Sequence, residues 1–197
     1  MASVVVPFRG SDPKQRLAIA EADRRTLAGA MLADVVAAAR PVGRVVVVAP
    51  AGPGVPDGVL RVADPRRGQG AAVVAGLAAA EAAGLPGPYL IVNADLPCAT
   101  TRDLLALAGA VPDHGLALVA ARDETTNALA LADPGLFEPV YGPGSAGRFA
   151  ALAASTVLDA PNLVDDVDTL GDLTRLTDRL GAHTRRVLAA LDLPSAA

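Results

Sequence analysis

The stretch that first indicates the fold is YLIVNADLP at residues 89–97, in which a short apolar run ends in the acid Asp95. An apolar run of this kind is typical of a strand buried on both faces of a parallel sheet. Other short apolar or β-branched runs predict further strands at residues 4–6, 45–48, 60–63, 116–121, 128–132 and 157–158. Helical spacing of apolar residues predicts helices at about 14–40, 71–83, 101–110, 145–154, 170–180 and 185–191. Strand and helix therefore alternate through the first two-thirds of the chain, which predicts a three-layer α/β fold with a mostly parallel mixed sheet.

Length and composition exclude several classes of protein. The 197 residues are 52% hydrophobic, which fits one folded domain over residues 1–197 and excludes a disordered chain. A net charge of −4 and 3% aromatic residues argue against nucleic-acid binding. The single cysteine, Cys98, excludes an internal disulfide and leaves no zinc cluster. No apolar run reaches the ~20 residues of a membrane span, and the N-terminus lacks a signal-peptide pattern, so a cytoplasmic protein is expected.

Ligands of such sheets bind beyond the carboxyl ends of the strands, so the loops there are candidate sites. The loop at residues 9–16 follows the first predicted strand, leads into a helix and carries Arg9, Lys14 and Arg16. Backbone N–H groups and positive charge at such a place suit a triphosphate. Lys14 is the one lysine among 17 basic residues, which favours a role for a compact point charge. The Walker A pattern is absent, and an ordinary solvated loop is the alternative.

Two other loops carry carboxylates. Asp95 directly follows a predicted strand, and Asp166 and Asp168 lie at i and i+2 in a segment predicted to be extended. Alternate residues of an extended segment point the same way, so Asp166 and Asp168 are expected to share a metal site. Asp95, at the end of a strand, is a separate candidate metal ligand, and two acidic loops in one such sheet favour a bound metal over purely structural roles. Asp165 is expected to face away from that site and to be solvated. The alternative for Asp168 is the N-cap of the following helix.

A fourth candidate region combines residues 125–129 with residues 141–145. Ser145 lies near a predicted helix start, where its hydroxyl and nearby N–H groups would hold an anion. The alternative is that Ser145 only caps this helix.

The motifs taken together resemble a known enzyme family. They occur in the order KxRL (Lys14–Leu17), DPxxG (Asp64–Gly68), ADLP (Ala94–Pro97), TNAL (Thr126–Leu129), YGPGS (Tyr141–Ser145) and DxDT (Asp166–Thr169). This order resembles the 2-phospho-L-lactate and phosphoenolpyruvate guanylyltransferases of coenzyme F-420 biosynthesis, over roughly residues 4–175. The resemblance implies a Rossmann-like nucleotidyltransferase fold of the nucleotide-diphospho-sugar transferase type. The sequence departs from the family pattern at three places. Thr125 stands where the family usually has a glycine, and Gln69 and Gly70 stand where it has Leu and Asn. Asn93 stands where the family often has a smaller residue.

The resemblance also implies an activity, in which a phosphorylated acid attacks the α-phosphorus of GTP and releases pyrophosphate. The implied ligands of Mg²⁺ are Asp95, Asp166 and Asp168. The residues implied to hold the acceptor's phosphate and carboxylate are Thr126, Gly142 and Ser145. Lys14 and Arg16 are implied to lie against the nucleotide phosphates, and the loop from Asp64 to Gly70 near the guanine. With the first loop, the predicted nucleotide-binding residues are therefore Arg9, Lys14, Arg16, Asp64, Gly68 and Gly70, and the predicted catalytic residues are Lys14, Arg16 and Asp95.

The expected partners are GTP and a small phosphorylated carboxylic acid, with a homodimer as a possible assembly and with no nucleic acid or membrane. The sequence leaves the choice of acid open. Two alternatives also remain open at this point. One is a molybdopterin-type guanylyl- or cytidylyltransferase, although the first loop matches its Gly-rich pattern poorly. The other is a non-catalytic nucleotide-binding module of the same fold.

Overall fold

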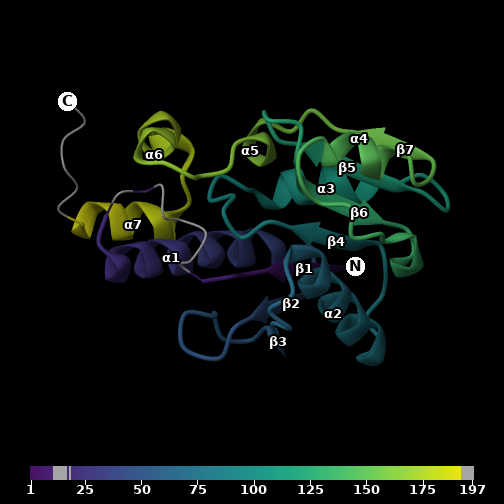
Figure 1. The fold of residues 1–197 in the computed structure, drawn as a ribbon, viewed down its shortest axis with the longest axis horizontal. Helices are drawn as coiled ribbons and strands as arrows, with labels where there is room; N and C mark the ends of the chain where they lie inside the picture. The colour runs from purple at the N-terminus through teal and green to yellow at the C-terminus, as the bar shows by residue number, and fades with distance from the viewer. Residues whose placement is uncertain (11–16, 18, 192–197) are drawn as a thin grey trace.

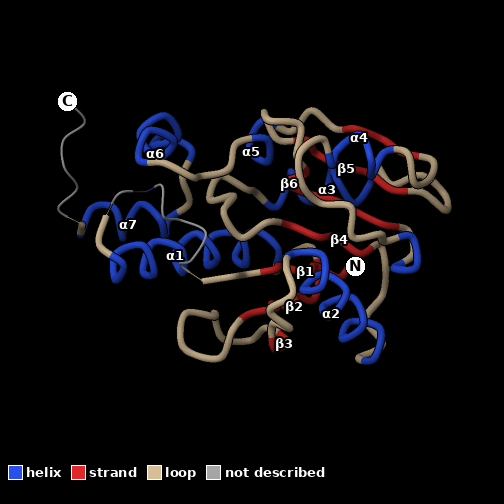
Figure 2. The backbone as a smooth tube through the Cα atoms, viewed as in Figure 1, coloured by secondary structure: helices blue, strands red, loops and turns tan. Residues whose placement is uncertain are grey.

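The computed structural model describes residues 1–10, 17 and 19–191 and contains a central sheet with helices on both faces (Figures 1 and 2). Its strands are β1 (Ala2–Pro7), β2 (Gly43–Ala49), β3 (Leu60–Ala63), β4 (Tyr89–Val92), β5 (Leu116–Ala120), β6 (Thr126–Leu131) and β7 (Ser155–Val157). They form one seven-stranded sheet in the order β3-β2-β1-β4-β6-β5-β7. β6 runs antiparallel to both of its neighbours, and the remaining pairs are parallel. The prediction of a mostly parallel mixed sheet is confirmed.

The helices divide between the two faces of the sheet. They are α1 (Glu21–Ala39), α2 (Gln69–Ala82), α3 (Thr101–Gly109), α4 (Ser145–Ala150), α5 (Pro161–Val164), α6 (Leu170–Leu176) and α7 (Ala182–Ala190), with short 3-10 turns η2 (Pro134–Leu136) and η3 (Thr177–Arg179). One hydrophobic core takes side chains from α1, α3, α5 and α6, and the other takes them from α2 and α4. Successive residues of β1 contribute to opposite cores, Val4 and Val6 to the first and Val5 to the second, because side chains alternate along a strand. The three predicted layers are therefore present.

Three predicted helices are shorter than their periodicity suggested. α1 begins at Glu21 rather than near residue 14, since Ala20 is extended and the Arg24 side chain bonds the Ile19 carbonyl oxygen instead. α4 ends at Ala150 rather than 154, because the chain must turn before β7 pairs with β5. α6 ends at Leu176 and continues only as a 3-10 turn.

The strand order places a topological switch point between β1 and β4. From β1 the chain moves outward through β2 and β3, then returns to place β4 on the other side of β1. In open α/β sheets, ligands bind in the crevice that such a reversal leaves beyond the carboxyl ends of the strands. The ends of β1 and β4 are therefore where the fold leads us to expect the site.

The C-terminal helices are anchored on the first one. α7 lies along α1 (Figure 1), and the buried Asp34 of α1 accepts hydrogen bonds from the backbone N–H groups of His183 and Thr184, at 2.9 Å each. Those are orphan donors at the start of α7, so a buried carboxylate is a suitable partner for them. Within the described part of the chain, no helix has both the length and the apolar character that crossing a membrane requires.

Candidate active site

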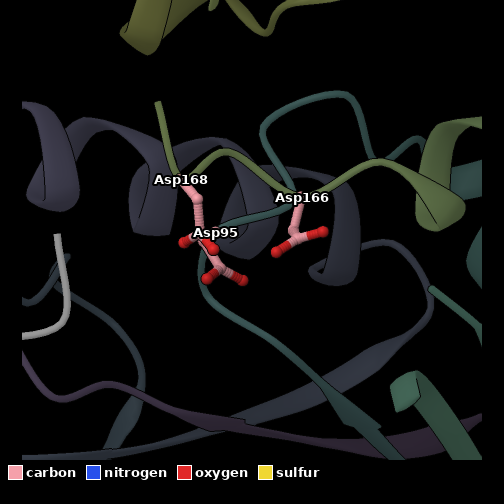
Figure 3. A group of neighbouring side chains, drawn as sticks. All are labelled: Asp95, Asp166 and Asp168. Atoms are coloured by element: carbon pink, nitrogen blue, oxygen red, sulfur yellow. The ribbon is translucent and has the colours of Figure 1, made fainter. Parts of the chain in front are cut away.

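Three carboxylates meet beyond the end of β4. Asp95 follows that strand by three residues, and Asp166 and Asp168 lie in the extended segment between α5 and α6 (Figures 2 and 3). One oxygen of each carboxylate lies within 4.8 Å of an oxygen of the other two, and all three residues are half-buried. The Val167 N–H donates to the carbonyl oxygen of Asp95 at 3.1 Å, so a backbone hydrogen bond ties the two segments together. The structure thus brings together the three acids that the sequence singled out.

Alternation along the extended segment explains why Asp166 and Asp168 point the same way. Asp165 and Val167 are buried on the opposite side of the segment. The expectation that Asp165 is solvated is wrong, although it does face away from the other acids. The carboxylate of Asp165 is only 2% exposed, and it is surrounded by guanidinium groups.

Three arginines hold Asp165. Arg122 Nε and Arg175 Nη1 donate to its Oδ1 at 2.6 and 2.8 Å, and Arg179 Nη2 donates to its Oδ2 at 2.8 Å. The hydrogen bonds from Arg122 first, and those from Arg179 and Arg175, hold the pKa of this carboxyl far below the usual range of an aspartate. Asp165 is therefore ionised at any pH at which the protein would be studied, and it neutralises part of the arginine cluster.

The capping alternative for Asp168 is not what the structure shows. The N-cap of α6 is Thr169, whose hydroxyl accepts from the Asp172 N–H, while the Asp172 carboxylate accepts in return from the Thr169 N–H. This is a complete capping box, so the helix does not need the side chain of Asp168. That side chain points toward Asp95 instead (Figure 3).

A pocket opens beside Asp95 at the switch point between β1 and β4. Its lining includes Arg9 from the end of β1, Gln69 from the first turn of α2, and Asn93 and Asp95 after β4. Lys14 and Arg16, the two basic residues assigned to the nucleotide phosphates, lie outside the described residues.

The loop before α2 lies beside the Arg9 guanidinium at this pocket. Gly68 is the N-cap of α2 and has φ +93°, a conformation that favours glycine. A Cβ at Gly68 would lie 4.0 Å from the Arg9 guanidinium, so two segments assigned to the nucleotide are neighbours. Asp64 folds back on its own loop and accepts from the Arg66 N–H at 2.8 Å. Gly70 serves a close approach, because a Cβ there would lie 2.6 Å from the Cβ of Pro139.

The three residues assigned to the acceptor also lie together. The hydroxyl oxygens of Thr126 and Ser145 are 3.1 Å apart and both side chains are buried, while the Ser145 N–H donates to the Gly142 carbonyl oxygen at 3.0 Å. Ser145 is the first residue inside α4, whose N-cap is Gly144, so it is not the capping residue. Thr125, where the family usually has a glycine, lies in the turn between β5 and β6. The residue with a positive φ in this turn is Glu124, so the backbone at Thr125 does not require glycine.

Sequence reasoning gave no role to two polar residues near the site. Asn127 is 3% exposed, and its side chain donates to the carbonyl oxygens of Leu163 and Val164 just before the carboxylate segment. Arg148 donates to the carbonyl oxygens of Val140 and Pro143, and so braces the acceptor loop. The usable signal for Asn127 was its place in the TNAL motif, within the candidate region at residues 125–129. Arg148, one of 16 arginines, gave none.

Comparison with known proteins decides the family. The sequence profile of the MobA-like NTP transferase domain matches residues 9–191. A phosphoenolpyruvate guanylyltransferase from Sphaerobacter thermophilus is 38% identical over 193 residues, covering 87% of this chain and 90% of that protein. The chain belongs to this guanylyltransferase family. The resemblance inferred from the six motifs is thereby confirmed.

Other relatives agree with this assignment. A 2-phospho-L-lactate guanylyltransferase from Methanoregula boonei is 31% identical over 195 residues, covering 95% of this guanylyltransferase-family chain and 87% of the relative. A crystal structure from Desulfovibrio desulfuricans G20, provisionally assigned as a nucleotide-diphospho-sugar transferase, superposes with a TM-score of 0.73 at 17% identity, covering 96% and 95% of the two chains. At that identity the likeness supports the fold alone, and it confirms the predicted nucleotidyltransferase architecture.

Proposed function

We propose that this chain forms one domain that transfers GMP from GTP to a small phosphorylated acid, phosphoenolpyruvate or 2-phospho-L-lactate, with release of pyrophosphate, in coenzyme F-420 biosynthesis. One observation carries this proposal. The carboxylates of Asp95, Asp166 and Asp168 converge beside the switch-point pocket, in a chain whose relatives are named as guanylyltransferases. A chain that had kept only the fold would have no reason to keep three converging acids at that place.

The carboxylate cluster fits a magnesium ion. Hard oxygen ligands are what Mg²⁺ prefers, and oxygens bound to one Mg²⁺ at about 2.1 Å lie at most about 4.2 Å apart. One oxygen from each of the three acids lies within 4.8 Å of the other two, so small movements would bring all three onto one ion. Three ionised carboxylates so close together also repel one another unless a cation is bound. When bound, Mg²⁺ would neutralise phosphate charge and help to align the attacking and leaving oxygens.

The nucleotide side of the pocket would be built from Arg9, Lys14, Arg16 and the loop from Asp64 to Gly70. The Arg9 guanidinium beside Gly68 already places positive charge at the start of α2. Arg offers a planar fork to phosphate oxygens, whereas Lys offers a compact charge. Lys14 is therefore the better candidate to stabilise the negative charge that develops on the departing pyrophosphate.

The acceptor side would be built from Thr126, Gly142 and Ser145. The adjacent hydroxyls of Thr126 and Ser145 would donate to the phosphate and carboxylate oxygens of the acid. Asn93, at the pocket, donates to the Thr126 carbonyl oxygen at 3.3 Å, so the acceptor residues adjoin the nucleotide pocket. This contact supports a donor and an acceptor bound next to each other, at the ends of the neighbouring strands β4 and β6, as a direct transfer would require.

The transfer needs no protein nucleophile. An oxygen of the acceptor's phosphate forms a bond to the α-phosphorus of GTP, and the bond from that phosphorus to the bridging oxygen of pyrophosphate breaks. The attacking phosphate is already largely ionised at neutral pH, since its second pKa is about 6, so no general base is required. The residues of the chain therefore act by positioning the substrates and neutralising charge.

The direct test is pyrophosphate release from the purified protein with Mg²⁺, each of the four nucleoside triphosphates, and each candidate acceptor in turn, the phosphorylated acids and molybdopterin included. We expect release with GTP and with phosphoenolpyruvate or 2-phospho-L-lactate. Equal release with ATP or CTP would overturn the guanylyl assignment, and release only with a molybdopterin acceptor would favour that alternative. Release from no pair, by a folded protein, would favour a non-catalytic module. Asp95→Asn is the control for contaminating activity, because it removes one metal ligand at nearly constant size.

A further inference from the structure

Three side-chain amides join the nucleotide pocket to the segment that carries the metal-binding acids. Gln69 Nε2 donates to Asn93 Oδ1 at 2.8 Å, and Asn93 Nδ2 donates to Asn127 Oδ1 at 3.4 Å. Asn127 Nδ2 then donates to the carbonyl oxygens of Leu163 and Val164, at 3.1 and 2.9 Å. All three amides point the same way, each donating to the next. We call Gln69, Asn93 and Asn127 the amide relay.

An irregularity of the sheet aims Asn127 at its targets. Val119 pairs with Ala128, but Ala120 pairs with Thr126, so Asn127 is the extra residue of a bulge in β6. A bulge redirects a side chain away from the regular alternation of the strand. Thr126 consequently faces Ser145 of α4, while Asn127 faces the end of α5 across the sheet.

The far end of the relay satisfies carbonyl groups that a helix end leaves without intrahelical partners. Leu163 and Val164 end α5, and the next residues are the extended segment with Asp166 and Asp168. A carbonyl at a buried helix end that loses its donor is destabilising, so the Asn127 amide fixes where this segment begins. The near end of the relay, Gln69, lines the pocket together with Arg9 and Asp95.

We propose that the amide relay is a positioning device that couples the nucleotide side of the pocket to the metal-binding segment. Each amide has its orientation set by the one before it, because reversing one amide would put two carbonyl oxygens or two NH₂ groups in contact. A change at Gln69 therefore reaches Asp166 and Asp168 through Asn127, without touching either acid. This inference rests on the proposed function, since it takes the acids to be metal ligands.

The test is a double-mutant cycle on binding of Mn²⁺ alone, measured by electron paramagnetic resonance on the full-length protein without nucleotide. Asn127→Leu removes the donor to α5, and Gln69→Leu removes the first donor at similar size. Outer-sphere partners of metal ligands typically contribute 10–100-fold to affinity, so we expect Asn127→Leu to weaken Mn²⁺ binding about tenfold. We expect about threefold for Gln69→Leu. The double variant should bind no more weakly than Asn127→Leu alone, because the relay is already broken there.

Several outcomes would overturn the relay. Additive effects, about thirtyfold in the double variant, would mean that Gln69 and Asn127 act separately. An unchanged Mn²⁺ affinity in Gln69→Leu would also overturn the relay. Because this result does not depend on Asn127→Leu, the test stays decisive if Asn127→Leu fails to fold. The matched control is Asn162→Leu, since Asn162 lies in α5 but donates to Asp103 Oδ2 at 3.1 Å and accepts from Arg179 Nη1 at 3.3 Å, both outside the relay. If this control weakens Mn²⁺ binding equally, general loosening of α5 explains the effect and the relay is wrong. Absence of Mn²⁺ binding to the unaltered protein would instead overturn the metal site of the proposed function, and the relay with it.

Discussion

Replacing Asp165 with asparagine should destabilise the protein substantially, although Asp165 is not one of the three converging acids. The substitution keeps the size of the side chain and removes its charge. It leaves Arg122, Arg175 and Arg179 converging on a neutral group that presents an NH₂ donor to at least one of them. Donor against donor is unfavourable, and the three cations then lack their shared counter-ion.

The magnitude follows from burial on each side of the cluster. Removing one partner of a buried ion pair typically costs about 3–5 kcal/mol. Here the carboxylate is 2% exposed, but Arg122, Arg175 and Arg179 are 70%, 43% and 38% exposed, so their guanidinium groups can turn toward water. Solvent access therefore lowers the expected loss to about 2–3 kcal/mol. For a chain of this length that corresponds to a fall in Tm of roughly 4–12 °C.

The assay is urea unfolding at pH 7, with Glu21→Gln as the control. Glu21 pairs with Arg25 on the surface of α1 at 2.6 Å, with both side chains about two-thirds exposed, so its loss should cost at most about 0.5 kcal/mol. A loss for Asp165→Asn as small as the control's would refute the idea that burial makes this ion pair matter.

The dependence on pH gives an independent check. Because the folded-state pKa of Asp165 is depressed, its contribution is fully present above the unfolded value, about 3.9, and is lost as the pH falls toward the folded value. The difference in stability between the unaltered protein and Asp165→Asn should thus be constant from pH 8 to about 5 and shrink below pH 4. A difference that grew on acidification would contradict the assignment.

Four further substitutions test the site and its packing. Asp95→Asn and Asp168→Asn should each lower Mg²⁺-dependent pyrophosphate release at least about 100-fold with little change in Tm; survival of activity in the second would return Asp168 to a structural role. Lys14→Ala should lower kcat about 100-fold, as loss of a group that stabilises developing charge commonly does, and unchanged steady-state kinetics would count against a role at the phosphates. Gly70→Asn should cost about 1–3 kcal/mol in urea unfolding, because its Cβ would lie 2.6 Å from that of Pro139; a neutral change would show that this contact relaxes easily.

The strands were the part of the fold that the sequence predicted best, and the reason is local. The run YLIV at residues 89–92 is buried on both faces, so its composition alone reveals it. The start of α1 was not predictable in the same way. Leu17 continues the helical spacing and is buried, yet the structure describes it in a 3-10 turn before Glu21, because periodicity reports which residues face a core and not which hydrogen bonds form.

The directions in which the three acids point were also predictable, since two local rules suffice for them, whereas the meeting of the two loops was implied only by the resemblance to the family. Asp95 directly follows a buried strand, and Asp166 and Asp168 have the i, i+2 spacing of an extended segment. The partners of Asp165 were not predictable, because Arg122 is 43 residues away in sequence and nothing about its neighbours marks it. A pairing that exists only through tertiary packing leaves no trace in local pattern.

The segment from Asp165 to Asp168 both anchors itself to the fold and presents two of the converging acids. An extended chain presents alternate residues to opposite sides, so Asp165 and Val167 anchor the segment while Asp166 and Asp168 face Asp95. Anchoring must be strong here, because two mutually repelling carboxylates would otherwise push the segment away from Asp95 before a cation binds. The Val167 N–H on the Asp95 carbonyl oxygen and the three arginines on Asp165 oppose that displacement from the two ends of the segment. Loss of the Asp165 anchor should therefore lower both the free energy of unfolding and the affinity for a divalent cation. The Asp165→Asn variant, which should unfold at lower urea concentration, should also bind Mn²⁺ more weakly.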